Sequence, residues 1–125
     1  MPHIIVTTHG PLAMALGQSL ELIAGPQPAI SYLSLAPGDD VQGYQALIEN
    51  ALPPDHVALI LVDMAGGTPW NTAVRIAGRY PGVRVVSGVN LSMLLEVALA
   101  RQDETIEDLA RMAHDAGREA IRVYN

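Results

Sequence analysis

The sequence contains no cysteine and no lysine, so all seven of its basic residues are arginine. The lack of cysteine excludes a disulfide framework, a thiolate metal site and a thiol nucleophile. The lack of lysine excludes the phosphate-binding lysine of P-loop nucleotide hydrolases and Schiff-base chemistry. It also removes the lysine that receiver domains use beside their phosphoacceptor aspartate.

The chain also lacks a basic lead segment and an apolar run near 18 residues, so we expect neither a signal peptide nor a membrane span. Its formal net charge of −6 disfavours nucleic acid and anionic membrane as partners and would suit a basic protein surface. No spacing of histidine, aspartate and glutamate is typical of a metal site, and we expect no cofactor. With 125 residues and 50% hydrophobic content, residues 1–125 are expected to form one domain with a substantial core.

Predicted strands and helices alternate along the whole chain. Such alternation is typical of βαβ units, which build a mainly parallel sheet with right-handed crossovers and helices on both faces. The expected strands cover residues 3–8, 29–35, 57–62, 83–89 and 119–124, and the expected helices cover residues 11–24, 39–52, 69–79, 91–101 and 103–116.

Several of these helices carry start and stop signals. Asp39, with Gln42 three residues later, fits a capping box. Asn90 is expected to cap the helix that follows it. Gly117 is expected to end the helix before the last strand.

The stretch VALILVDMAGGTPWN, residues 57–71, is expected to run from a buried strand through a glycine loop into a helix. Asp63 ends the strand. Gly66 and Gly67 allow a ligand to approach the loop backbone closely. Thr68 is a good N-cap, and the proline after it suits the first helical position. The free backbone N–H groups at this helix start therefore predict a phosphate site.

A histidine stands at the end of another predicted strand. Ligands of parallel sheets bind beyond the carboxyl ends of the strands, where the strand order reverses. If the first and third strands flank that point, His9 and Asp63 face each other. A carboxylate that accepts from Nδ1–H leaves the Nε2 lone pair free, which makes His9 a candidate nucleophile for phosphoryl transfer. That reaction mainly requires alignment of the reacting groups and stabilisation of the negative charge on the phosphoryl oxygens. The N–H groups near Gly67 could supply this charge stabilisation.

Three stretches carry a resemblance to a known family. THG at residues 8–10, VDMAGGTPWN at 62–71 and SGVNLSMLLE at 87–96 resemble the signature stretches of the IIA component (EIIA) of the mannose-family bacterial phosphotransferase system (PTS). The similarity covers essentially the whole chain, in order and at matching spacing. The sequence departs modestly from the family at Ser92, where proline is common, and at Ala65, where an aromatic residue is frequent.

The resemblance implies a function for the predicted site. His9 would take a phosphoryl group from the phosphocarrier protein HPr and pass it to a IIB component, for sugar uptake and phosphorylation. Asp63 would orient the imidazole, and Thr68 would lie near the phosphoryl oxygens. The resemblance also implies a cytoplasmic homodimer whose last strand pairs with the sheet of the other subunit, and a link to the membrane only through the IIC and IID transporter.

The predicted fold is therefore an α/β three-layer sandwich, with four parallel strands, a C-terminal antiparallel strand and helices on both faces. Other readings stay open. His9 could be an ordinary strand-end residue, Asp63 a loop anchor or the phosphoacceptor of a receiver-like switch, and Thr68 only a cap. The chain could also serve as a binding module, as the related subunit of dihydroxyacetone kinase, or as a regulatory relay without transport. The other histidines look structural: His3, His56 and His114.

Overall fold

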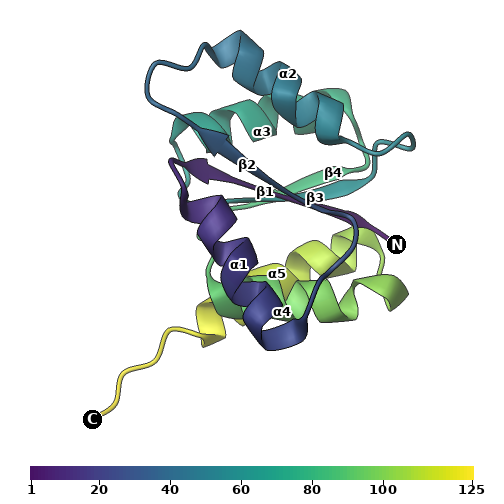
Figure 1. Cartoon of the computed structure of the whole chain (residues 1–125). Helices are drawn as coiled ribbons and strands as arrows, with labels where there is room; N and C mark the ends of the chain where they lie inside the picture. The colour runs from purple at the N-terminus through teal and green to yellow at the C-terminus, as the bar shows by residue number, and fades with distance from the viewer.

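The computed structural model describes residues 1–125 and consists of three layers (Figure 1). Four parallel strands form the central sheet: β1 (His3–His9), β2 (Ile30–Leu35), β3 (Ala58–Val62) and β4 (Val83–Val86). One face is covered by α2 (Val41–Ala51) and α3 (Thr68–Arg79), and the other by α1 (Leu12–Ala24), α4 (Leu91–Ala100) and α5 (Ile106–Glu119). A short 3₁₀ turn, η1 (Arg101–Asp103), follows α4. The predicted α/β class, parallel sheet and two helical layers are confirmed.

The apolar core lies on both sides of the sheet. Along β1 the side chains alternate, so that Ile4 packs with the layer of α1, α4 and α5, whereas Ile5 packs with α2 and α3. All five residues of β3 are fully buried. This burial explains why β3 reads as a continuous apolar run rather than as alternating polar and apolar residues.

The strand order β2-β1-β3-β4 places the reversal of chain direction between β1 and β3. The chain moves from β1 to β2 on one side and then returns to β3 and β4 on the other. The expectation that the first and third strands are neighbours is confirmed by their pairing, which runs from His3 opposite Ala58 to Thr7 opposite Val62. The carboxyl ends of β1 and β3 therefore meet at one edge of the sheet, where ligand sites of such folds occur.

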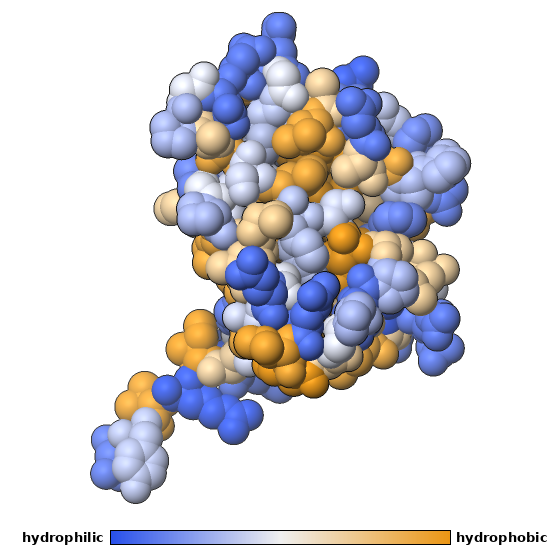
Figure 2. Space-filling view, viewed as in Figure 1, coloured by the Kyte–Doolittle hydropathy of each residue, from blue (hydrophilic) through white to orange (hydrophobic).

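The C-terminal antiparallel strand expected at residues 119–124 does not form in the single chain, and the first of these residues, Glu119, belongs to α5. Helix α5 continues through Gly117 to Glu119, and the tail beyond it leaves the body of the molecule (Figure 1). Gly117 therefore lies inside the helix and does not end it; a Cβ there would lie 2.7 Å from Met93 Cε in α4. The tail, which Figure 2 shows projecting from the rest of the surface, exposes three large side chains: Ile121, Val123 and Tyr124.

The start of α2 differs by one residue from the predicted capping box. Asp40, not Asp39, caps the helix, and its carboxylate accepts from Gly43 N at 3.0 Å. Asp39 instead accepts from Ala36 N at 2.7 Å and so closes the preceding turn. Because the two aspartates are adjacent and both suit a cap, only the backbone conformation decides between them.

The predicted cap at Asn90 is confirmed, since its side chain accepts from Met93 N at 2.9 Å. The preceding strand is shorter than expected: β4 ends at Val86, and Val89 is held by an N–H donated to Val62 O at 3.0 Å. None of the helices combines the length and apolarity needed to cross a bilayer.

Two helical glycines offer a matched test of the packing between α1 and β2. A Cβ at Gly17 in α1 would lie 2.6 Å from Tyr32 Cζ, whereas a Cβ at Gly78 in α3 would meet nothing within 4 Å. Alanine gains about 1 kcal/mol of helix propensity over glycine at either position, but overpacking costs about 1–3 kcal/mol. We therefore expect Gly17→Ala to lower the free energy of unfolding and Gly78→Ala to raise it, as measured by urea denaturation. Equal effects of the two substitutions would contradict this close packing.

Candidate functional site

His9 and Asp63 meet at the carboxyl edge of the sheet. Asp63 Oδ2 lies 2.8 Å from His9 Nδ1 and also accepts from the backbone N of His9 at 3.1 Å. An ionised carboxylate can only accept hydrogen bonds, so Nδ1 carries a proton, and in the neutral imidazole Nε2 then has a free lone pair. The His9 side chain is 48% exposed and that of Asp63 only 15%, so the ring faces solvent while its partner is sheltered.

The hydrogen bonds from His9 determine the ionisation of Asp63. Burial alone would raise the pKa of the Asp63 carboxyl, but the side-chain and backbone hydrogen bonds from His9 and its charge lower it. The net pKa of Asp63 lies below its ordinary value. Its second oxygen, Oδ1, accepts from Met64 N at 3.1 Å. The carboxylate is therefore ionised at neutral pH and fixed through both oxygens.

The glycine loop after β3 runs beside the imidazole. Gly66 has φ +87°, a conformation that favours glycine. Gly67 is extended, and a Cβ there would lie 2.9 Å from His9 Cε1 and 3.4 Å from Nε2. A side chain at Gly67 would therefore displace the ring, so glycine at this position lets the loop backbone lie next to Nε2.

Helix α3 starts directly after this loop, one residue earlier than the sequence suggested. Gly67 is the N-cap and Thr68 is the first helical residue. The prediction that Thr68 caps the helix is therefore wrong. Pro69, expected at the first helical position, occupies the second. The first N–H groups of a helix lack intrahelical acceptors and form its positive end, which favours an anion beside Gly67 and Nε2.

One residue of the site was missed by sequence reasoning. Thr8 is fully buried, and its Oγ1 accepts from Ala13 N at 2.8 Å. This bond ties the first turn of α1 to the residue before His9, and Gly10, with φ +58°, makes the intervening turn. The signal was present in the sequence, because threonine is typical of positions that bind the N–H groups of a helix start.

The remaining histidines lie outside the site. His3 begins β1, at the amino ends of the strands and so at the end of the sheet opposite to the site. His56 stacks on Tyr80, with ring centroids 4.6 Å apart. His114 Nδ1 lies 3.0 Å from Asp115 Oδ1, so a second histidine–aspartate pair exists on α5. Both partners there are more than half exposed. His114 shares a pocket with Gly88 and Asn90, but its aspartate is not sheltered as Asp63 is. No group of three or more histidine, aspartate and glutamate side chains is placed to hold a metal ion.

Comparison with known proteins identifies the family. The EIIA-man family model, described as "PTS system fructose IIA component", matches residues 3–114. The chain belongs to this family. It is 32% identical over 124 residues to the "PTS system mannose-specific EIIAB component" of Escherichia coli (strain K12), covering 95% of this chain but only 38% of that protein. It is 33% identical over 112 residues to the "PTS system fructose-specific EIIA component" of Bacillus subtilis (strain 168), covering 87% of this chain and 77% of that protein.

Solved structures of EIIA proteins share the fold. The "Mannose/sorbose specific IIA subunit of phosphotransferase system" from Enterococcus faecalis matches with a TM-score of 0.93 and 32% identity, covering 99% of this chain and 95% of that one. EIIA from Streptococcus agalactiae matches with a TM-score of 0.93 and 31% identity, covering 98% and 97%. The family resemblance inferred from the three sequence stretches is thus confirmed.

The lowered pKa of Asp63 predicts a pH-dependent contribution to stability. A carboxylate with a depressed folded pKa stabilises the protein above its ordinary pKa of about 3.9, and this stability is lost as pH falls through the folded pKa. We expect wild type to exceed Asp63→Asn in unfolding free energy at neutral pH, with the difference shrinking between about pH 5 and pH 2. Urea denaturation across this range measures it. Asp115→Asn is the matched control with a much smaller change, because exposed ion pairs contribute little. A pH-independent difference for Asp63→Asn would contradict the assignment.

Proposed function

We propose that this chain is a phosphotransfer protein of the sugar phosphotransferase system that carries a phosphoryl group on Nε2 of His9. The observation that carries the proposal is the Nδ1–Oδ2 hydrogen bond of 2.8 Å, which leaves Nε2 free beside the Gly67 backbone and the start of α3. In the proposed step, the Nε2 lone pair forms a bond to phosphorus while the bond between phosphorus and the donor breaks and its electrons leave with the donor. The reverse step at the same atom delivers the group to the acceptor.

The surroundings of His9 suit both directions of transfer. The ring gains positive charge as Nε2 attacks, and the Asp63 carboxylate stabilises that charge. Backbone N–H groups near Gly66, Gly67 and Thr68 are proposed to bind the phosphoryl oxygens, supported by the positive end of α3. The Thr68 hydroxyl has no capping duty, so it is available for an additional phosphoryl contact. Phosphoryl transfer depends mainly on such positioning and charge stabilisation, so the proposal needs no cofactor.

The proposed partners follow from the family. HPr would donate the phosphoryl group and a IIB component would accept it, in the cytoplasm, with the membrane reached only through the IIC and IID transporter. The relatives reported above are named as PTS components, which favours sugar transport over the dihydroxyacetone kinase alternative. The E. coli relative extends well beyond the region that this chain matches. The activity of that whole protein is therefore only proposed for this chain. Mannose, fructose and sorbose all occur among the relatives' names, and the sugar stays open.

We further propose that the chain forms a homodimer through its exposed tail. Ile121 and Val123 alternate with Arg122 and are 79% and 89% exposed, so one face of an extended tail is apolar and uncovered. The sheet of a single chain leaves β4 as an edge strand. Open edges of this kind are usually covered or paired. Pairing of the tail, as an antiparallel strand, with the sheet of a second copy would cover both features in a closed two-fold assembly.

Phosphorylation of the purified chain tests the proposed function. Incubated with phosphoenolpyruvate, enzyme I and HPr, the chain should gain one phosphoryl group per subunit that is labile in acid and stable in base, as a phosphoramidate is. His9→Ala should abolish the label, and His114→Ala, which breaks the other histidine–aspartate pair, should leave it intact. Mass spectrometry of the intact protein measures the mass added. A base-labile adduct, or labelling of His9→Ala, would refute the histidine assignment.

Light scattering tests the dimer. We expect a mass about twice the 13.3 kDa of one chain at micromolar concentration. Ile121→Asp combined with Val123→Asp should yield monomers, because charge on the apolar face of the tail opposes its burial. Arg122→Ala is the matched control and should remain dimeric. A wild-type mass near 13.3 kDa would overturn the dimer and the strand exchange together.

A further inference from the structure

Two buried hydroxyl groups are hydrogen-bonded to each other beneath the site. Thr7 Oγ1 in β1 bonds to the phenolic oxygen of Tyr44 in α2, and the two residues are 0% and 3% exposed. The surrounding cluster is apolar and includes Ile5, Ile48 and Val62. Burying a hydroxyl without a partner costs free energy, so each hydroxyl depends on the other. A phenylalanine and a valine would fill the same space without this dependence.

The pair lies where β1 loses one of its neighbours. Thr7, opposite Val62, is the last residue of β1 that pairs with β3. His9, two residues further and on the same face by strand alternation, pairs only with Leu35 of β2. The backbone that carries the imidazole is thus flanked by a strand on one side alone, directly after the Thr7–Tyr44 bond.

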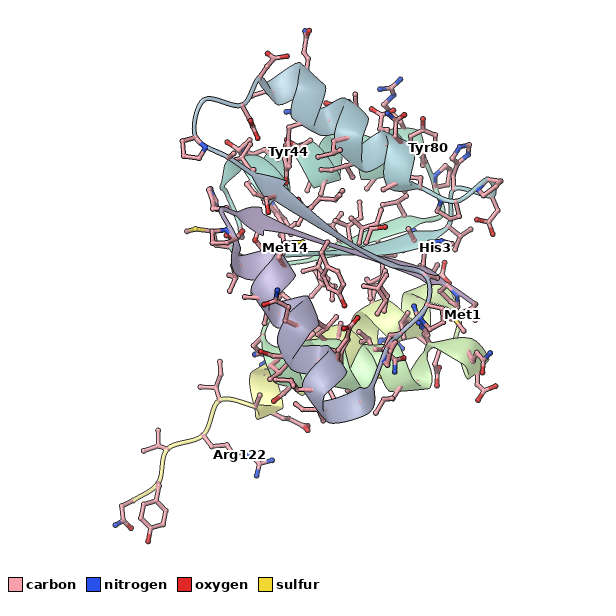
Figure 3. All side chains as sticks on the ribbon, in the orientation of Figure 1. Met1, His3, Met14, Tyr44, Tyr80 and Arg122 are labelled. Atoms are coloured by element: carbon pink, nitrogen blue, oxygen red, sulfur yellow. The ribbon has the colours of Figure 1, made fainter.

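Tyr44 belongs to the same end of the molecule as the site. It lies in the first part of α2 and donates its backbone N–H to Asp40 O at 2.9 Å. Figure 3 shows Tyr44 at the end of the upper layer nearer the start of α1, and Tyr80 at the opposite end. Burial raises the pKa of the Tyr44 phenol, the bond with Thr7 lowers it, and the negative charge of Asp63 raises it further. The phenol therefore stays protonated within electrostatic reach of the carboxylate that holds His9.

We propose that Tyr44, acting through Thr7, is a positioning residue for His9: it anchors β1 to α2 at the point where β1 leaves β3 and so fixes the direction of Nε2. This inference rests on the proposed phosphotransfer function. Asp63 holds the ring and the backbone of His9, but it follows the end of β3 and restrains His9 from that side only. The hydroxyl pair restrains the strand from the helical layer. Phosphoryl transfer needs an aligned nucleophile, and a misplacement of about 1 Å can cost roughly 10²-fold in rate.

The test compares four single variants. Tyr44→Phe and Thr7→Val each remove one hydroxyl and keep most of the side-chain volume. Thr7→Ser keeps the hydroxyl and is the conservative rescue. Tyr80→Phe is the matched control, because it also removes a phenolic hydrogen bond, to Glu49 Oε2 at 3.2 Å, but at the far end of α3. Circular dichroism first establishes that each variant is folded at the assay temperature.

Steady-state phosphorylation by HPr separates positioning from docking and from general stability. We expect Tyr44→Phe and Thr7→Val to lower kcat about 5- to 20-fold, a fraction of the misplacement cost given above, with KM for HPr within about twofold. Thr7→Ser should recover most of the loss, and Tyr80→Phe should match wild type. A wild-type kcat in both Tyr44→Phe and Thr7→Val, or a loss only in KM, would overturn the inference.

Nitrogen NMR of the unphosphorylated protein supplies a second readout that does not need transfer. We expect the His9 ring signals to shift in Tyr44→Phe and Thr7→Val and to stay unchanged in Tyr80→Phe. Unchanged His9 signals in all variants would overturn the positioning role. Failure of the proposed function has a different signature: the wild-type chain would take no phosphoryl group from HPr, while the His9 signals would still report whether Tyr44 positions the ring.

Discussion

One oxygen of Asp63 holds both the backbone and the ring of His9, and the site depends on this contact. Because the same Oδ2 accepts from both nitrogens, the imidazole is fixed relative to its own main chain, not merely attracted to a charge. The contact exists only because β1 and β3 are adjacent and parallel, which brings the ends of two strands separated by more than 50 residues to one edge. The strand order is thus the structural requirement, and the tautomer of His9 is its chemical consequence.

The exposed pair on α5 shows how much the surroundings add. His114 and Asp115 make a hydrogen bond of similar length, yet they are neighbours on one helix and lie in solvent. At His9 the carboxylate is sheltered, the glycine loop lies against the ring, and the first turn of α3 supplies N–H groups. The site proposed for phosphotransfer therefore differs from the exposed pair in its sheltered carboxylate and in the glycine loop that lies against the ring.

Sequence reasoning succeeded where the physical signal is periodic or repeated. The alternation of strand and helix, the buried run of β3, the meeting of His9 with Asp63 and the cap at Asn90 could all be predicted. The errors came from choices between adjacent residues or from tertiary contacts. Asp39 and Thr68 each lost the role of cap to a neighbour, and Gly117 serves a contact with Met93 that no local pattern reveals. The bond between Thr7 and Tyr44 spans 37 residues and has no sequence signature.

A phosphoryl carrier, the role that we propose for His9, must receive and release the group at the same atom, and this constrains where His9 can be held. Every contact described for His9 comes from its β1 neighbours, from Asp63 or from the glycine loop, while about half of its side chain remains exposed. A restraint that covered the open side of the ring would block one of two partner proteins. Rigidity must therefore be built beneath the ring, in the sheet and the layer of α2 and α3. The buried polar contacts accordingly lie in the two residues before His9, Thr7 with Tyr44 and Thr8 with the start of α1, away from the exposed side of the ring that the proposed partners would approach.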